Sequence, residues 1–155
     1  MSLPSATETD LTIGPEAIIG YSRLPYTMWY ALAEFIDNST QSRLNYASII
    51  DDVLRKEGTP LVVSITYDRV NRWLEVEDNS IGMTEDDLRC ALRIAVPTVD
   101  SQGRSKYGMG MKTAACWLGR RWTVTTCEWS SGIEWTAQVD VDAIVQKRSK
   151  IPLTP

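Results

Sequence analysis

Residues 77–83 read Glu-Asp-Asn-Ser-Ile-Gly-Met, and they join a strand-like run to a helix start. Before them, Leu74 and Val76 alternate with acids, which is typical of a strand with one wet face. After them, Thr84 and the acids at 85–87 are typical of a capped helix N-terminus. An acid at a strand end can aim its carboxylate into a crevice at the sheet edge, where ligands of α/β folds tend to bind. A plain turn is an equally good interpretation, because Asp and Asn favour turns and glycine supplies a positive φ.

Helical and strand-like segments alternate on both sides of this turn. Helices are predicted at about 26–46, 48–56, 84–96 and 108–118, and strands at 61–67, 73–77, 122–128 and 133–139. Residues 1–14 are expected to form an extended lead-in, and no element is predicted after Asp140. This order predicts one α/β domain, a two-layer sandwich with a mixed, mostly antiparallel sheet and helices on one face.

Composition limits the function classes. The chain has 155 residues, 43% of them hydrophobic and 23% charged, which suits one sizeable core. The net charge of -4 argues against a surface that wraps nucleic acid. Histidine is absent, so His-based metal sites, Ser-His-Asp triads and Cys-His dyads are excluded within this chain.

The cysteines and the apolar runs indicate a compartment. Cys90, Cys116 and Cys127 are odd in number, form no CxxC and have apolar neighbours, which predicts buried, reduced thiols and a cytoplasmic location. No apolar run approaches the roughly 18 residues that cross a bilayer, and no signal peptide pattern opens the chain. We therefore expect no membrane partner.

A second polar stretch lies in the first long helical segment. Residues 34–38 read Glu-Phe-Ile-Asp-Asn, so Glu34 and Asn38 are four residues apart and share a helix face. That face is expected to turn away from the helical stripe that holds Met28, Leu32, Phe35, Ile36 and Ser39. A carboxylate and an amide would then point together, although a solvated helix face is the better explanation of a single such pair.

A third stretch is rich in glycine. Residues 103–113 read Gly-Arg-Ser-Lys-Tyr-Gly-Met-Gly-Met-Lys-Thr and run into a helix. Free backbone N–H groups at a helix start form an anion nest, to which Lys106 or Lys112 would add charge. The spacing from Gly103 to Lys112 is not that of the GxxxxGK[ST] phosphate loop. A flexible connector is the alternative.

Taken together and in this order, the three stretches resemble the GHKL superfamily of ATPases: gyrase-type topoisomerases, heat-shock-ninety chaperones, MutL proteins, sensor histidine kinases and microrchidia proteins. The pattern is most similar to the heat-shock-ninety-like and microrchidia-like branch. The resemblance covers about residues 25–140. It implies a Bergerat-type ATP-binding domain over residues 15–155, part of a longer protein, that lacks its last strand or strands.

The resemblance also assigns roles to residues. It implies that Glu34 is the general base and that Asn38 holds Mg2+, with Asp37 in a water-mediated contact. It implies that Asp78 accepts a hydrogen bond from the adenine amino group. It also implies that Gly82 lets the backbone approach the adenine base and that Met83 packs on the adenine ring. The implied lid over the phosphates comprises Lys106, Gly108, Gly110, Met111, Lys112 and Thr113.

Three positions near these motifs depart from the family pattern. Ser80 stands where the family usually has a glycine, Gln41 where an Asp often follows the metal ligand, and Ser105 where the lid often has a glycine. We expect a Mg2+-dependent ATPase module that forms a nucleotide-dependent homodimer in the full-length protein. Nucleic acid or a protein client would bind through other domains. The alternatives are a switch that binds ATP without turnover, a kinase that phosphorylates a partner histidine, and a fold relic without ligand.

Overall fold

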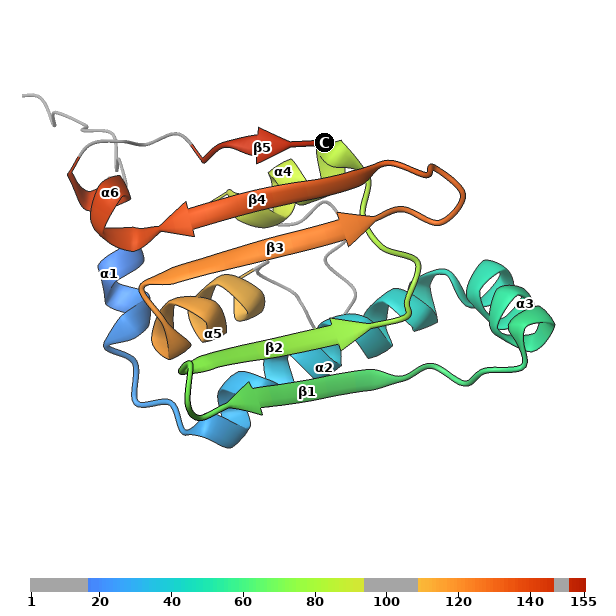
Figure 1. Ribbon diagram of the computed structural model, residues 1–155, viewed down its shortest axis with the longest axis horizontal. Coiled ribbons are helices and arrows are strands. Elements are labelled where there is room, and N and C mark those ends of the chain that lie inside the picture. The colour runs from blue at the N-terminus through green and yellow to red at the C-terminus, as the bar shows by residue number, and fades with distance from the viewer. Residues whose placement is uncertain (1–16, 94–108, 147–150) are drawn as a thin grey trace, which may run out of the picture.

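The computed structural model describes residues 17–93, 109–146 and 151–155. Strands form one layer of the molecule, and helices pack behind it (Figure 1). The helices are α1 (Ala17–Ser22), α2 (Met28–Asn45), α3 (Ala47–Glu57), α4 (Glu85–Leu92), α5 (Gly110–Leu118) and α6 (Val141–Val145). The strands are β1 (Val63–Asp68), β2 (Trp73–Asp78), β3 (Arg121–Cys127), β4 (Glu134–Asp140) and β5 (Leu153–Thr154).

The strands form two antiparallel ladders. β1 pairs with β2, with Val63 opposite Asp78, and β3 pairs with β4. β4 also pairs with β5, with Leu153 opposite Ala137. In Figure 1, β2 and β3 point the same way, and β1 and β4 point the opposite way, so the strand layer is mixed in direction. The predicted fold class, a two-layer α/β sandwich with a mostly antiparallel sheet, is confirmed.

Local signals set most element boundaries. Thr84 Oγ1 accepts a hydrogen bond from the Asp87 amide at 3.1 Å, and the Asp87 carboxylate accepts one from the Thr84 amide, so the predicted cap starts α4. Gly58 ends α3 in the left-handed conformation, with φ of 69°. The predicted helix over 84–96 was too long. It ends at Leu92, because Arg93 is extended.

The tail after Asp140 was expected to hold no element, and that prediction was wrong. Asp140 caps α6, where its Oδ1 accepts a hydrogen bond from the Ala143 amide at 3.0 Å. β5 then adds to the β4 edge. Helix α6 has five residues and β5 has two, too few for a hydrophobic period to be visible.

The buried face of α2 also differs from the prediction. Met28 and Ile36, expected on the apolar stripe, are exposed, whereas the buried residues of α2 are Ala31 and Ser39. Both buried residues of α2 are small, and α2 packs against α5. No helix within the described ranges is long and apolar enough to cross a membrane.

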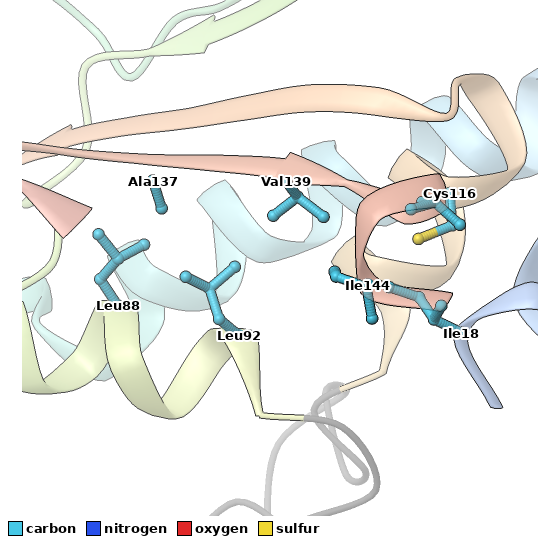
Figure 2. Close-up of a cluster of buried hydrophobic side chains, with 8 residues drawn as sticks. Ile18, Leu88, Leu92, Cys116, Ala137, Val139 and Ile144 are labelled. Atoms are coloured by element: carbon cyan, nitrogen blue, oxygen red, sulfur yellow. The ribbon is translucent and has the colours of Figure 1, made fainter. Parts of the chain in front are cut away.

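The main core lies between α4 and the β4 side of the strand layer, with α1, α5 and α6 closing one end (Figure 2). Leu88 and Leu92, four residues apart on α4, point toward Ala137 and Val139 of β4 (Figure 2). The full buried cluster is Ile18, Leu88, Leu92, Cys116, Ala137, Val139, Val141 and Ile144. This arrangement fixes α4 and α5 against the strands.

The cysteines are free thiols, as expected, but only Cys116 is buried. The prediction that Cys90 and Cys127 are buried was wrong. Cys90 lies two residues from both Leu88 and Leu92, on the opposite side of α4. Cys127 follows the buried Thr126, and neighbouring residues of a strand face opposite sides.

Leu88 is fully buried, so replacing it with alanine should remove core packing and leave a cavity. We expect Leu88→Ala to lower the free energy of unfolding by about 2–5 kcal/mol. The matched control is Leu44→Ala, whose side chain on α2 is 64% exposed, and it should change stability by less than about 0.5 kcal/mol. Denaturant unfolding measures both, and equal stability losses would contradict the position of this core.

Candidate functional site

The candidate site is built on α2. Glu34, Asp37 and Asn38 are half-buried, and Ser39 beside them is 4% exposed. Residues 31, 34, 35, 38 and 39 follow the i, i+3, i+4, i+7, i+8 spacing of one helix face. The expectation that Glu34 and Asn38 turn away from the packed side is therefore wrong. Their polar groups lie within the inner stripe.

Glu34 joins the polar stretch of residues 34–38 to the glycine-rich stretch. Its Oε1 accepts a hydrogen bond from the Tyr26 hydroxyl at 3.3 Å. A Cβ on Gly110 would lie 2.1 Å from Glu34 Oε2, so a side chain there would displace the carboxylate. Gly110 is the first residue of α5, and the N-terminus of a helix carries free N–H groups and partial positive charge. The Glu34 carboxylate thus lies against the start of α5.

Asp78 joins α2 to the turn after β2. Its Oδ2 accepts a hydrogen bond from Ser39 Oγ at 2.6 Å, and its Oδ1 accepts one from the Ser80 amide at 2.8 Å. Sequence reasoning missed Ser39, which it had placed on an apolar stripe. A buried hydroxyl needs a hydrogen-bond partner, and that requirement was the available signal. Asp78 remains exposed beyond these two bonds.

Ser80 and Gly82 shape the turn. Besides its amide contact with Asp78, Ser80 donates from Oγ to Ser42 Oγ at 3.0 Å, so a serine fits where the family usually has glycine. Gly82 has φ of 74°, and a Cβ there would lie 1.9 Å from the Cys127 carbonyl oxygen. Glycine is required at this position for both reasons.

The same turn is fastened to the end of β3. The Met83 amide donates to Thr126 Oγ1 at 2.8 Å, and the Trp129 amide donates to the Ile81 carbonyl at 2.7 Å. Thr126 is buried, and the Met83 side chain packs against the core cluster. Thr126 is a second residue that sequence reasoning missed, because its contact crosses 43 positions of sequence.

The glycine-rich stretch is described from Met109 onward, so the predicted Lys106 and Gly108 lie outside the described residues. Met111 is half-buried against the core, and Thr113 is buried. Lys112 is 3% exposed, and its Nζ donates to the Ala91 carbonyl at 2.7 Å. Burial lowers the pKa of this ammonium group. Lys112 therefore ties the last turn of α4 to α5.

The residues present suit a magnesium ion that is shared with a phosphate ligand. No group of three His, Cys, Asp or Glu side chains within the described ranges could hold a metal alone. Mg2+ needs no such cage, because it prefers hard oxygen ligands and usually keeps waters and phosphate oxygens. The Asn38 amide, with the neighbouring Asp37 carboxylate, offers oxygen donors of that kind.

A cavity of about 190 Å³ lies on the α3 side of the turn that follows Asp78. Its lining comprises Ile49, Ile50, Val53, Leu54, Glu57, Asn79, Ser80, Ile81 and Trp129. None of the predicted site residues that the structure describes lines it, and its walls are mostly apolar.

Comparison with known proteins agrees with this geometry. A sequence model of the family described as "Histidine kinase-, DNA gyrase B-, and HSP90-like ATPase" matches residues 26–155. The chain is also similar to the chaperone protein HtpG of Nitrobacter winogradskyi, with 44% identity over 63 residues, 39% of this chain and 10% of that chaperone. The chain thus spans only a small part of this relative's length. The chain belongs to the family of histidine kinase-, DNA gyrase B- and HSP90-like ATPases and is an ATP-binding module of that kind.

Proposed function

We propose that this module binds ATP together with Mg2+ and hydrolyses the bond between the β and γ phosphates. The observation that carries the proposal is that three stretches far apart in the sequence meet at α2. Glu34 of α2 lies against Gly110, and Asp78 bonds to Ser39, the neighbour of Asn38. A packing role alone does not require a carboxylate at each of these contacts. A site that hydrolyses a nucleotide needs a hydrogen-bond acceptor for the adenine ring and a general base for the attacking water.

Asp78 is the proposed acceptor for the adenine amino group. Each of its carboxylate oxygens accepts one hydrogen bond from the protein, from Ser39 and from Ser80. A carboxylate has about four acceptor sites, so capacity remains for a ligand donor. The two protein bonds fix the orientation of the carboxylate. Guanine presents a carbonyl where adenine presents its amino group, so Asp78 would select adenine. Gly82 and Met83 would lie beside the base.

Asn38 is the proposed metal ligand, and Asp37 would contact the ion through water. The ion, when bound, neutralises charge on the phosphate oxygens. Gly110, Met111, Lys112 and Thr113 at the start of α5, with Lys106 and Gly108 before them, would face the triphosphate. For Lys112 to reach a phosphate, its ammonium group would have to leave the Ala91 carbonyl.

Glu34 is the proposed general base. A water molecule would attack the γ phosphorus, the bond to the bridging oxygen would break, and ADP would leave with that electron pair. A carboxylate oxygen of Glu34 would accept the proton from the attacking water. Its position against the start of α5 would place this oxygen on the phosphate side of the site.

A switch that binds ATP without turnover is the second candidate. The bond between Lys112 and the Ala91 carbonyl favours it, because this cation is occupied within the protein. In either case we propose a nucleotide-dependent homodimer in the full-length protein, and a cytoplasmic location that suits three free thiols. The process that the cycle of ATP binding and hydrolysis drives would depend on the clients and substrates of other domains.

Glu34 and Asn38 have different proposed roles, so their alanine variants should fail differently. For Glu34→Ala we expect ATP affinity to persist and turnover to fall by roughly 10²- to 10⁴-fold, since only the proton acceptor is lost. For Asn38→Ala we expect the affinity for Mg-ATP and the turnover to fall together, with metal-free nucleotide much less affected. Isothermal titration with and without Mg2+, paired with phosphate release, measures both effects.

The matched control for these variants is Glu75→Ala, which removes an exposed carboxylate from β2 and should leave both measurements unchanged. Loss of ATP binding in Glu34→Ala, or turnover at the wild-type rate, would remove Glu34 from the role of base. ATP binding without phosphate release by the wild type would favour the switch.

The proposed base recognition predicts a second pair of variants. Asp78→Asn should weaken ATP binding by about 5- to 150-fold, which corresponds to about 1–3 kcal/mol for an unmet polar group. Ser39→Ala should weaken it less, because Asp78 keeps its bond from the Ser80 amide. The neighbouring Glu77→Gln makes the same charge change at an exposed position and should bind like wild type. Titration with ATP and GTP measures this, and equal affinity of the wild type for both nucleotides would exclude the role of Asp78.

A further inference from the structure

Tyr26 contacts the candidate site from outside the three polar stretches. It lies between α1 and α2, where its amide donates to the Leu24 carbonyl at 2.7 Å. Its ring lies against the Trp117 indole of α5, with 6.4 Å between ring centroids and 46° between their planes. The ring is therefore held between the lead-in to α2 and the body of α5.

The Tyr26 hydroxyl holds one oxygen of Glu34 while the start of α5 confines the other. Oε1 accepts the phenol proton at 3.3 Å, and Oε2 occupies the space that a Cβ on Gly110 would fill. A glutamate side chain with neither contact has several rotamers of similar energy. With both contacts, the carboxylate is confined to one orientation over the start of α5.

The phenol is suited to be the donor in this pair. Burial raises the pKa of Tyr26, and the negative charge of Glu34 and the hydrogen bond between them raise it further. The hydroxyl therefore keeps its proton at neutral pH.

We infer that Tyr26 is a positioning residue that holds the Glu34 carboxylate in the orientation in which it accepts a proton from the attacking water. The inference rests on the proposed function, because it assigns Tyr26 a role only if Glu34 is the base. In this role Tyr26 need not contact the nucleotide. It acts through Glu34, and small errors in the placement of a reacting group are costly.

The test is Tyr26→Phe in the full-length protein, which keeps the ring against Trp117 and removes only the hydroxyl. We expect kcat for phosphate release to fall about ten-fold, with the Kd for Mg-ATP within about two-fold of wild type. The matched control is Tyr30→Phe, which removes a hydroxyl from a side chain that is 67% exposed on α2, and it should change neither quantity. Thermal unfolding of each variant confirms that the fold is kept.

A double-mutant comparison separates positioning from a general structural effect. In the Glu34→Ala background, Tyr26→Phe should cause no further loss of turnover, because the carboxylate it orients is absent. A kcat like wild type in Tyr26→Phe would overturn the inference. An equal further loss of turnover in the Glu34→Ala background would also overturn it. So would an affinity for Mg-ATP that falls by the same factor as kcat.

The same measurements distinguish failure of the inference from failure of the proposed function. If the wild type releases no phosphate, or Glu34→Ala works at the wild-type rate, the proposed hydrolysis mechanism falls and the role of Tyr26 falls with it. If the wild type hydrolyses ATP, Glu34→Ala does not, and Tyr26→Phe does so at the full rate, only the role of Tyr26 is overturned.

Discussion

The approach of the turn at residues 79–83 to the end of β3 is the constraint on which the arrangement of the two hairpins depends. The structure pairs β1 with β2, and β3 with β4 and β5, in separate ladders. Gly82 passes so close to the Cys127 carbonyl that no side chain fits. Two hydrogen bonds, from the Met83 amide to Thr126 and from the Trp129 amide to the Ile81 carbonyl, fasten the turn to the end of β3. The strand end that carries Asp78 is thereby fixed relative to β3.

Helix α2 converts this constraint into a site. Its inner stripe holds Ala31, Glu34, Phe35, Asn38 and Ser39, so small and polar side chains take four of five positions that an ordinary packed helix gives to large apolar ones. Burying polar groups is costly unless they are hydrogen-bonded. The bonds from Ser39 to Asp78 and from Tyr26 to Glu34 meet that cost, and they also orient the two carboxylates.

Stability and site chemistry are divided between different parts of the fold. The largest fully buried side chains, Leu88, Val141 and Cys116, belong to the cluster around α4, α5 and α6. The candidate site lies on α2 and at the end of β2, outside that cluster. Lys112 connects the two regions, because its ammonium group holds the last turn of α4 from within α5. Helix α5 therefore takes part in the core at one end and meets Glu34 at the other.

The sequence by itself determined the order of helices and strands from α2 to β4, the cap at Thr84, and the three polar stretches that identified the family. These features are local, because a hydrophobic period, a cap or a motif is complete within a few residues. They also placed Glu34 and Asn38 on one helix face. The short elements after Asp140 were not predicted, because too few residues carry their pattern.

Only the tertiary structure decided which face of α2 is packed and which side chains complete the site. Ser39, Thr126 and Tyr26 carry no motif, and two of them bond to residues about 40 positions away, Ser39 to Asp78 and Thr126 to Met83. Their partners are chosen by how helices and strands pack, which the pattern of one segment does not contain. The same holds for Lys112, whose type and place suggested a phosphate contact and whose ammonium group the fold directs to a carbonyl of α4.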